Sequence, residues 1–376
     1  MTTLALLLPL LLATPQRPPE PFASHAVPTQ QISVQPNDAF AAIVSNATAI
    51  RMDPRTQKAE ELAERGNVAS VALGDDSYTL GLRDGRILHV DQNGTPTEFV
   101  VRKGRTILGV QRHGDLIAWW AVDSTANVLD LRTGAQRFDP PLEVSIHFQY
   151  PAVRFATDGR FLCLRDRSNR PEAAAFVRVL ETKDASEIAR LPCYASHGDD
   201  FVIAGSRVVH AQRLDAKTWN LLAFDLDARE PRVLDAELRG GHFVDLFASP
   251  SGRFVVEGDF EEKGLARYGF ADKEAARVEF EEDLRAVGCG FLRVGGEPVE
   301  VVFAQSRRER GELIAVRLDD LSRVDCRLPR SGEPGLDVAG TFAGGLGMWH
   351  CDWAGAGATR TRRMHFFALD PDAKPR

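Results

Sequence analysis

A turn that ends in Gly-Arg-Phe occurs twice in this chain and constrains the fold more than any other feature of the sequence. Residues 243–257 read as an apolar run, a turn with Gly-Arg-Phe at 252–254, and a second apolar run. Residues 152–164 have the same order, with Gly-Arg-Phe at 159–161. Two β-rich runs joined by a short Gly turn are typical of antiparallel strands. We therefore expect an array of small antiparallel sheets.

A second marker is an acidic residue at the end of a strand, followed by a polar turn. In residues 128–134 an apolar run ends in Asp130 and the chain then turns toward Gly134. Neighbouring markers are 39 to 51 residues apart, which matches the roughly 40 to 50 residues of a four-stranded propeller blade. The markers are Asp91, Asp130, Glu181, Asp225, Asp272, Asp319 and Asp370, with Asp53 as a further candidate upstream.

A hairpin turn precedes each of the seven acidic turns, as expected between the first two strands of a blade. A sandwich or a helical fold would not readily produce this alternation of two turn types. The sequence therefore predicts an all-β fold, a seven-bladed β-propeller of four-stranded antiparallel blades, with eight blades as the alternative. The hairpin turns lie at 75–77, 113–115, 158–160, 205–207, 251–253, 295–297 and 344–345.

A propeller removes its exposed sheet edges when the first and last segments of the chain pair. The last unit ends at Asp370 with three expected strands, so a fourth has to come from elsewhere. We expect residues 58–63 to supply it beside residues 364–369, and a short helix at 58–63 is the competing interpretation. The propeller is then predicted over residues 67–376, with residues 27–66 as an N-terminal segment that includes the closing strand.

The beginning of the chain has the features of a targeting segment. The apolar run at residues 4–13 is too short to span a bilayer, which needs about 20 apolar residues. Cleavage is expected either at the small-residue site 24–26 or nearer Ala13. Residues 1–26 are predicted to be a signal peptide or apolar leader with a tether, and residues 14–31 to lack regular structure. The mature protein is predicted to be exported, to the periplasm or outside the cell, without stable membrane insertion.

Charge and aromatic content argue against nucleic acid as a partner. The net charge of the 376-residue chain is -7, which provides no basic field for a phosphate backbone. The five Trp and four Tyr are scattered along the chain and do not form a base-stacking surface.

Residues 241–259 carry a family resemblance. Their Gly-His start and Ser-Pro-Ser-Gly turn resemble a blade of the WD-repeat-like and TolB-like β-propellers. The Trp-Asp dipeptide that ends a WD repeat is absent. The resemblance implies a propeller superfamily that includes interaction scaffolds, lactonases and other hydrolases, and quinone-dependent dehydrogenases, so it does not specify one activity.

The densest polar and aromatic cluster is at residues 349–353. If this segment is a strand, His350 and Asp352 share one face, because side chains alternate along a strand. They are candidate binding residues for a ligand or metal. The alternative is that both are solvated or pair with each other.

Adjacent Trp119 and Trp120 place one indole on each face of an expected strand. Trp120 is the third candidate binding residue, as an exposed aromatic group in a partner-binding patch. Core packing of both indoles is the alternative.

The five cysteines form no CxxC pair, which argues against a zinc site and against a dense disulfide framework. They are expected to be small buried apolar residues, with at most two disulfides as the alternative. The sequence predicts no catalytic residue, no metal site and no identified cofactor. The cysteines are Cys163, Cys193, Cys289, Cys326 and Cys351.

These observations favour an exported β-propeller that binds a protein or a small molecule through loops at one end of the ring. The alternative is a propeller hydrolase or lactonase with its site in the central channel. The sequence favours a binding module over an enzyme because it contains no nucleophile elbow, phosphate-binding loop or dinucleotide-binding fingerprint.

Overall fold

The computed structural model describes most of the chain between residues 21 and 368, and the statements below refer to that part. It forms 31 strands and no helix. The described residues therefore contain no helix that could cross a membrane. The described residues are 21, 23–27, 40–44, 47–53, 56–74, 77–146, 153–167, 175–193, 201–214, 218–239, 244–259, 264–271, 275–279, 284–306, 313–324, 339–342, 347–354 and 361–368.

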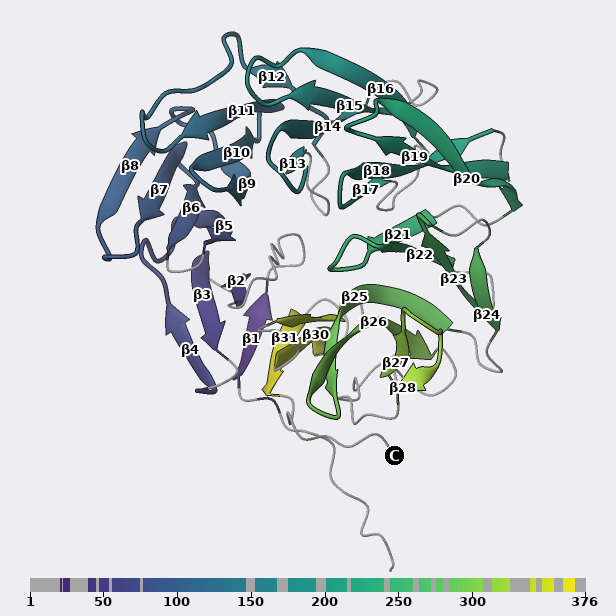
Figure 1. Ribbon diagram of the computed structural model, residues 1–376. Helices are drawn as coiled ribbons and strands as arrows, with labels where there is room; N and C mark the ends of the chain where they lie inside the picture. The colour runs from purple at the N-terminus through teal and green to yellow at the C-terminus, as the bar shows by residue number, and fades with distance from the viewer. Residues whose placement is uncertain are drawn as a thin grey trace, which may run out of the picture.

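The strands form antiparallel sheets that are arranged around a common centre as the blades of a ring (Figure 1). Each of the first three blades has four strands. Blade 1 consists of β5 (Val68–Leu73), β6 (Tyr78–Leu82), β7 (Arg86–Val90) and β8 (Pro96–Val100). Blade 2 consists of β9 (Ile107–His113), β10 (Leu116–Ala121), β11 (Thr125–Asp130) and β12 (Leu142–Glu143). Blade 3 consists of β13 (Val153–Phe155), β14 (Phe161–Arg167), β15 (Ala175–Glu181) and β16 (Glu187–Cys193).

The next three blades repeat this order. Blade 4 consists of β17 (Phe201–Ala204), β18 (Arg207–Arg213), β19 (Thr218–Asp225) and β20 (Glu230–Arg239). Blade 5 consists of β21 (Val244–Ala248), β22 (Phe254–Asp259), β23 (Gly264–Gly269) and β24 (Ala276–Glu279). Blade 6 consists of β25 (Leu284–Val294), β26 (Glu297–Ser306), β27 (Leu313–Arg317) and β28 (Arg323–Val324).

The two ends of the chain contribute the remaining two sheets. Blade 7 consists of β29 (Ala339–Phe342), β30 (Gly347–Ala354), β31 (Thr361–Ala368) and the N-terminal β1 (Ala23–Val27). Blade 8 has three described strands, β2 (Phe40–Val44), β3 (Thr48–Asp53) and β4 (Lys58–Glu61). The prediction of an all-β propeller with four-stranded antiparallel blades is confirmed. Seven sheets have four strands, and blade 8 has three. The described residues therefore form eight sheets, the number of blades given as the alternative in the sequence analysis.

The strand predicted to pair with the last strand was the wrong one. β1 pairs with β31, with His25 opposite Met364, whereas β4 pairs with β3, with Ala59 opposite Met52. The physical reason is that residues 40–61 form a sheet of their own, and the buried Ala49 of β3 packs against blade 1. The sheets therefore begin at Ala23 rather than at residue 67, and the expectation of no regular structure at 14–31 is wrong for 23–27.

Apolar side chains fill the space between neighbouring blades. Trp119 and Ile87 pack between blades 1 and 2, and Trp219 and Leu246 between blades 4 and 5. The remaining described boundaries have similar clusters, from blade 8 against blade 1 through blade 6 against blade 7. Both faces of a middle strand are therefore buried, and its residues read as a nearly continuous apolar run, as in β10.

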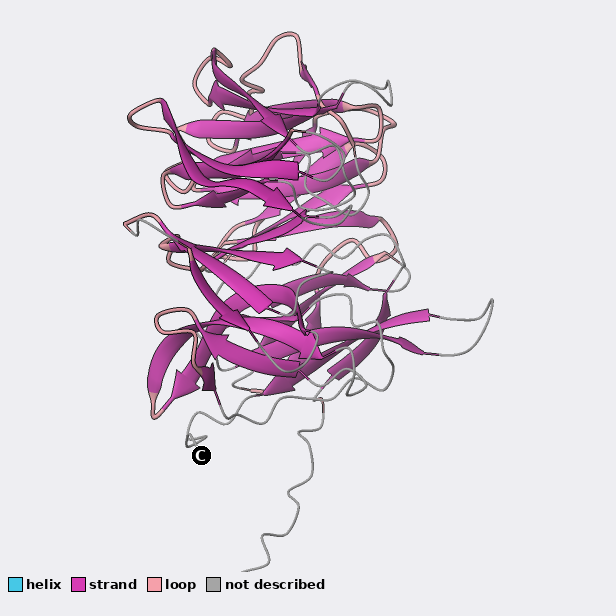
Figure 2. Cartoon of the chain, turned by 90° about the vertical axis from the view of Figure 1, so that its right-hand side faces the viewer, coloured by secondary structure: helices cyan, strands magenta, loops and turns pink. Residues whose placement is uncertain are grey.

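The two turn types of the sequence analysis lie on one face of the ring. Neighbouring strands are antiparallel, so the turn between strands one and two and the turn between strands three and four of a blade are at the same end. Figure 2 shows the ring from the side, with strands running between its two faces. We call this face of blades 1–6 the turn face. Its described turns include 91–95, 113–115, 131–135, 158–160, 182–186, 205–206, 226–229, 251–253, 295–296 and 318–322.

Hairpin turns of neighbouring blades touch one another on the turn face. The Thr157 hydroxyl donates to the Gly205 carbonyl at 2.9 Å. Gly252, with a φ of +70°, lies so close to the next turn that a Cβ atom there would be 2.3 Å from the Gly205 nitrogen. Glycine is required here both by the left-handed backbone conformation and by the contact.

Gly252→Ala is expected to destabilise the ring by about 2 to 4 kcal/mol, because a left-handed backbone and an overlap with backbone atoms both oppose a Cβ. Gly295→Ala is the control, since Gly295 has a φ of +63° and nothing within 4 Å of the added Cβ. That variant should lose only about 1 to 2 kcal/mol. Thermal unfolding checks the order. Equal losses in the two variants would show that the contact between turns contributes nothing.

Removal of residues 1–27 is expected to lower the melting temperature, because blade 7 loses β1 and exposes the edge of β31. Removal of residues 1–20 keeps β1 and serves as the matched control. Differential scanning calorimetry compares the two shortened chains. A melting temperature that is the same for both would contradict the pairing of β1 with β31.

Candidate functional site

The recurrent Gly-Arg-Phe turns join neighbouring blades through their arginines. Arg160, in the β13–β14 turn of blade 3, pairs with Asp227 in the β19–β20 turn of blade 4. Arg253, in the β21–β22 turn of blade 5, pairs at 3.2 Å with Asp319 in the β27–β28 turn of blade 6. The repeated sequence therefore produces a repeated ion pair across a blade boundary.

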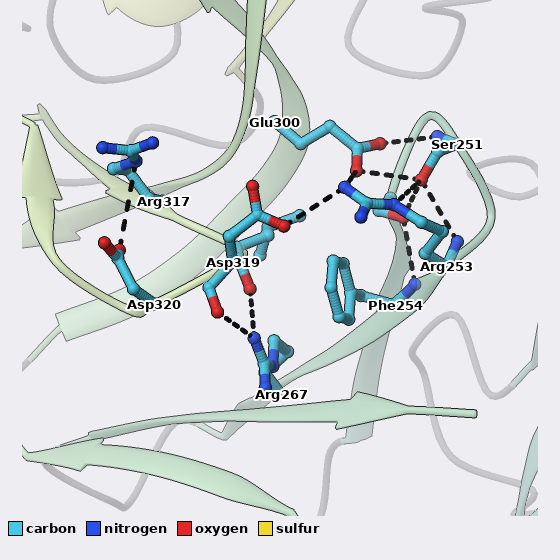
Figure 3. A network of polar contacts seen from close by, with 10 residues as sticks. Ser251, Arg253, Phe254, Arg267, Glu300, Arg317, Asp319 and Asp320 are labelled. Atoms are coloured by element: carbon cyan, nitrogen blue, oxygen red, sulfur yellow. Dashed lines mark hydrogen bonds and ion pairs between the residues drawn. The ribbon is translucent and has the colours of Figure 1, made fainter. Parts of the chain in front are cut away.

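A buried carboxylate completes the link between blades 5 and 6 (Figure 3). Glu300 of β26 accepts hydrogen bonds from the Ser251 amide at 2.6 Å and the Ser251 hydroxyl at 2.8 Å. It also accepts one from Arg253 at 3.0 Å. Arg267 of β23 donates to the carbonyls of Leu318 at 2.5 Å and Asp319 at 2.6 Å. One cation, Arg253, thus faces two carboxylates at this boundary.

The acidic marker residues fix the turns that follow them. The Asp91 carboxylate accepts from the amides of residues 93 and 95, and the Asp225 carboxylate from those of residues 227 and 228. Asp130 accepts from the Arg132 amide at 3.1 Å and from the Arg137 side chain at 3.2 Å. Burial raises the pKa of Asp130, but these hydrogen bonds outweigh that effect and hold it below its ordinary value. The markers therefore have a structural role as turn caps.

A pocket of about 440 Å³ lies on the turn face where blades 2, 3 and 4 meet. This volume is within the range of small-molecule sites, about 300 to 1,000 Å³. Its lining contains four cationic and two acidic side chains. We call it the turn-face pocket, and it is lined by His113, Leu116, Arg137, Asp158, Gly159, Arg160, Phe161, Glu181, Thr182, Lys183 and Arg229.

Glu181, at the end of β15, is the electrostatic centre of the turn-face pocket. Lys183 lies 2.6 Å from one of its oxygens, and Arg229 from blade 4 lies 2.8 Å from the other. The hydrogen bond from Lys183, followed by the charge of Arg229, lowers the pKa of Glu181. The same contact raises the pKa of Lys183. Two cations therefore share one ionised carboxylate.

Thr182 is a further polar residue of the pocket wall. Its amide donates to the Arg160 carbonyl at 2.8 Å. Its side-chain hydroxyl is buried and has no hydrogen-bond partner in the described part of the chain. A buried hydroxyl without a partner is unusual in a folded protein.

Trp120 does not form the predicted exposed patch. It is 8% exposed and packs with Val153 and Phe155 of blade 3, while Trp119 is fully buried on the other face of β10. The prediction of an exposed indole is wrong because β10 is a middle strand, with a blade on each side. The alternative, core packing of both residues, is what the structure has.

His350 and Asp352 lie on β30, whose neighbours in register are His365 and Arg363 of β31. The strand predicted for this segment is therefore present. The side chains of His350 and Asp352 lie outside the described part of the structure, and their role in ligand binding stays a prediction.

The described cysteines are free thiols. Cys163 and Cys193 are buried and Cys289 is half-buried, as expected of small apolar residues. Burial raises the pKa of Cys163 to about 12, so this thiol is protonated and unreactive at neutral pH. Cys326 and the side chain of Cys351 lie outside the described residues. Within the same range no group of three His, Cys, Asp or Glu side chains is placed to hold a metal ion.

The turn-face pocket was not predicted from the sequence. The signal was partly present, because Arg160 and Glu181 belong to the two turn markers. Lys183 and Arg229 follow acidic markers by two and four residues, but only the register of blades 3 and 4 brings them to the same carboxylate. Such convergence across a blade boundary has no signature in a linear sequence.

His210 illustrates how the described titratable groups are used within the fold. Its Nδ1 donates to the Pro192 carbonyl at 2.8 Å, and burial lowers its pKa to about 4. The imidazole is therefore neutral at physiological pH and holds β18 of blade 4 to β16 of blade 3.

Because the folded-state pKa of His210 is lowered from 6.5 to about 4, the unfolded chain takes up a proton first as the pH falls. The contribution of the neutral His210 imidazole to the free energy of unfolding is present above pH 6.5. It is lost progressively toward pH 4, by about 3 kcal/mol in total. His210→Gln should therefore lose less stability than the unchanged protein between pH 7 and pH 4.5. Unfolding followed by fluorescence at both pH values measures this difference. Equal losses would contradict a buried neutral imidazole.

The ring of antiparallel blades, with its two turn types on one face, defines the fold of the chain as a β-propeller. Solved structures with this fold include BamB from Moraxella catarrhalis, at 13% identity and a TM-score of 0.53, covering 92% of this chain and 99% of that one. A chain of a mitotic checkpoint complex is similar at 10% identity and a TM-score of 0.52, covering 98% and 99%. The computationally designed Ika8 protein is similar at 11% identity and a TM-score of 0.56, covering 90% and 98%.

At 10 to 13% identity these similarities show the fold alone, which is the β-propeller fold implied by the resemblance of residues 241–259. No protein-family model matches the sequence, and no curated protein is similar enough to count as a match.

Proposed function

We propose that the protein is an exported β-propeller that binds a partner protein through its turn face. The observation that carries this proposal is the turn-face pocket, where side chains from three blades converge on one site. The loops around it are held by ion pairs and by contacts between turns, so the site is preorganised. Preorganisation reduces the entropy lost on binding.

Two further observations support a binding role. A propeller built from rigid sheets presents loops whose sequence can vary without loss of core packing. One of the similar structures is a chain of a mitotic checkpoint complex, which shows that this fold works within a protein assembly.

The alternative function is that of a propeller hydrolase or lactonase, which requires polar groups that converge in the central channel. Two polar residues of inner strands, Gln111 and Arg154, instead bond the backbone of the next blade. Gln111 accepts from the Phe155 amide at 2.7 Å, and Arg154 donates to the Phe201 carbonyl at 3.2 Å. A screen of ester and lactone substrates tests the alternative directly. Turnover by the purified protein that is unaffected by changes at the turn-face pocket would favour the enzyme.

Export is part of the proposal, and β1 constrains how the leader would be removed. Cleavage at residues 24–26 would cut β1, which pairs with β31 over Ala23–Val27. Cleavage nearer Ala13 would leave this strand intact and is therefore the favoured site. The mass of the mature protein, recovered after export, distinguishes the two positions, and a chain that keeps residues 1–13 would contradict removal of the leader.

The binding proposal is tested by a photo-crosslinking amino acid at Ala228, an exposed residue next to Arg229 in the β19–β20 turn. Irradiation of cells that produce the protein is expected to give a discrete adduct with one partner, identified by mass spectrometry. Val233 on the outer strand β20 of the same blade is 54% exposed and is the matched control. Adducts from Val233 but not from Ala228, or from neither position, would contradict binding through the turn face.

A further inference from the structure

The cations of the turn-face pocket are exposed and its central carboxylate is not. The side chains of Lys183 and Arg229 are 70% and 55% exposed, whereas that of Glu181, which they share, is 18% exposed. An approaching ligand therefore meets the ammonium and guanidinium groups before the carboxylate. Exposed cations above a shielded carboxylate favour an anionic ligand.

The carboxylates around these two cations are already bonded within the fold. Glu181 is shared by Lys183 and Arg229, and Asp184, next to Lys183, accepts the Ser186 amide at 3.0 Å. With both carboxylates counted the two cations are balanced, so a ligand is attracted by the exposure of the cations and not by a net charge. A singly charged carboxylate suits such a site better than a phosphate dianion does.

The equivalent turn of blade 5 provides a comparison. Arg253 there faces two carboxylates, Glu300 at 3.0 Å and Asp319 at 3.2 Å, just as Arg160 of blade 3 faces Asp158 and Asp227. Blades 3 and 4 have in addition the two exposed cations that share Glu181. Arg253 is therefore an internal control for the ligand chemistry.

The buried Thr182 hydroxyl is the independent observation that points to a ligand. It has no hydrogen-bond partner among the described residues, and Thr182 lines the pocket between Glu181 and Lys183. A hydroxyl donates well to a carboxylate oxygen. The volume of about 440 Å³ accommodates one or two side chains rather than a folded domain.

We infer that the turn-face pocket receives a Glu or Asp side chain from an acidic segment of the partner, with Lys183 and Arg229 as its anion-binding residues and Thr182 as a hydrogen-bond donor. This inference rests on the proposed binding function and specifies the chemistry of the partner. The carboxylate of the ligand takes over part of the contact that Lys183 and Arg229 make with Glu181. Because this attraction is electrostatic, binding is expected to weaken as the salt concentration rises.

The test uses the full chain without its leader, with hexaglutamate as the probe in isothermal titration calorimetry at low salt. Arg229→Gln is expected to weaken binding by about tenfold to hundredfold, since a hydrogen bond between charged groups is lost. Arg253→Gln is the matched control and should bind as the unchanged protein does. Melting temperatures of both variants check that they are folded. Arg229→Gln breaks a largely exposed ion pair, which affects stability little, whereas Arg253→Gln leaves the buried Glu300 carboxylate with its two hydrogen bonds from Ser251.

Glu181→Gln gives the sharpest prediction, because it removes the competing carboxylate and is expected to tighten hexaglutamate binding. A purely structural role of Glu181 predicts weaker binding instead. Thr182→Val is expected to weaken binding without lowering the melting temperature, because the hydroxyl it removes has no hydrogen-bond partner among the described residues.

The inference is overturned if hexaglutamate does not bind, if Glu181→Gln weakens binding, or if Arg253→Gln weakens it as much as Arg229→Gln does. Inorganic phosphate is the second probe. Phosphate binding that depends on Arg229, with no binding of hexaglutamate, would reassign the site to a phosphate group. An adduct at Ala228 without hexaglutamate binding would refute the acidic ligand and leave the binding function standing, whereas hexaglutamate binding without an adduct would do the reverse.

Discussion

Contact between neighbouring blades is the constraint on which this structure depends. A single four-stranded sheet cannot bury both of its faces, so each blade is stable only against the next one. The apolar clusters at the blade boundaries, such as those around Trp119 and Trp219, provide the non-directional part of this contact. Contacts between turns, such as the close approach of Gly252 to Gly205 and the Arg253 to Asp319 ion pair, fix how neighbouring blades are aligned.

The turn face is where alignment and binding meet. The same side chains that cap turns and join blades also form the wall of the turn-face pocket, as Arg160 does through Asp227. Exposed ion pairs contribute little to stability individually, but they restrict the side chains that a ligand would contact. A site built in this way is ordered before a ligand arrives, and it draws on three blades rather than on one flexible loop.

The repeat was predictable from the sequence because each blade needs a glycine-containing hairpin turn and an acidic turn cap, as Gly252 and Asp225 show. Pairing between distant segments was not. Lys58–Glu61 has a strand-compatible sequence that suits β31 as well as β3, and only the formation of blade 8 decides between them. The burial of Trp120 follows from the position of β10 between two blades. The turn-face pocket depends on the register between blades, which leaves no local pattern.

Repetition also explains why one boundary of the ring is suited to binding and another is not. Arg160 and Arg253 occupy the same place in the same turn, so the backbone geometry does not distinguish them. The difference lies in the carboxylates nearby: Glu300 is almost fully buried beneath Arg253, whereas Glu181 lies between two cations from different blades. In a ring of similar blades, a site arises where one boundary carries additional exposed cations, and the fold tolerates this because the apolar layers below the turns hold the blades in place.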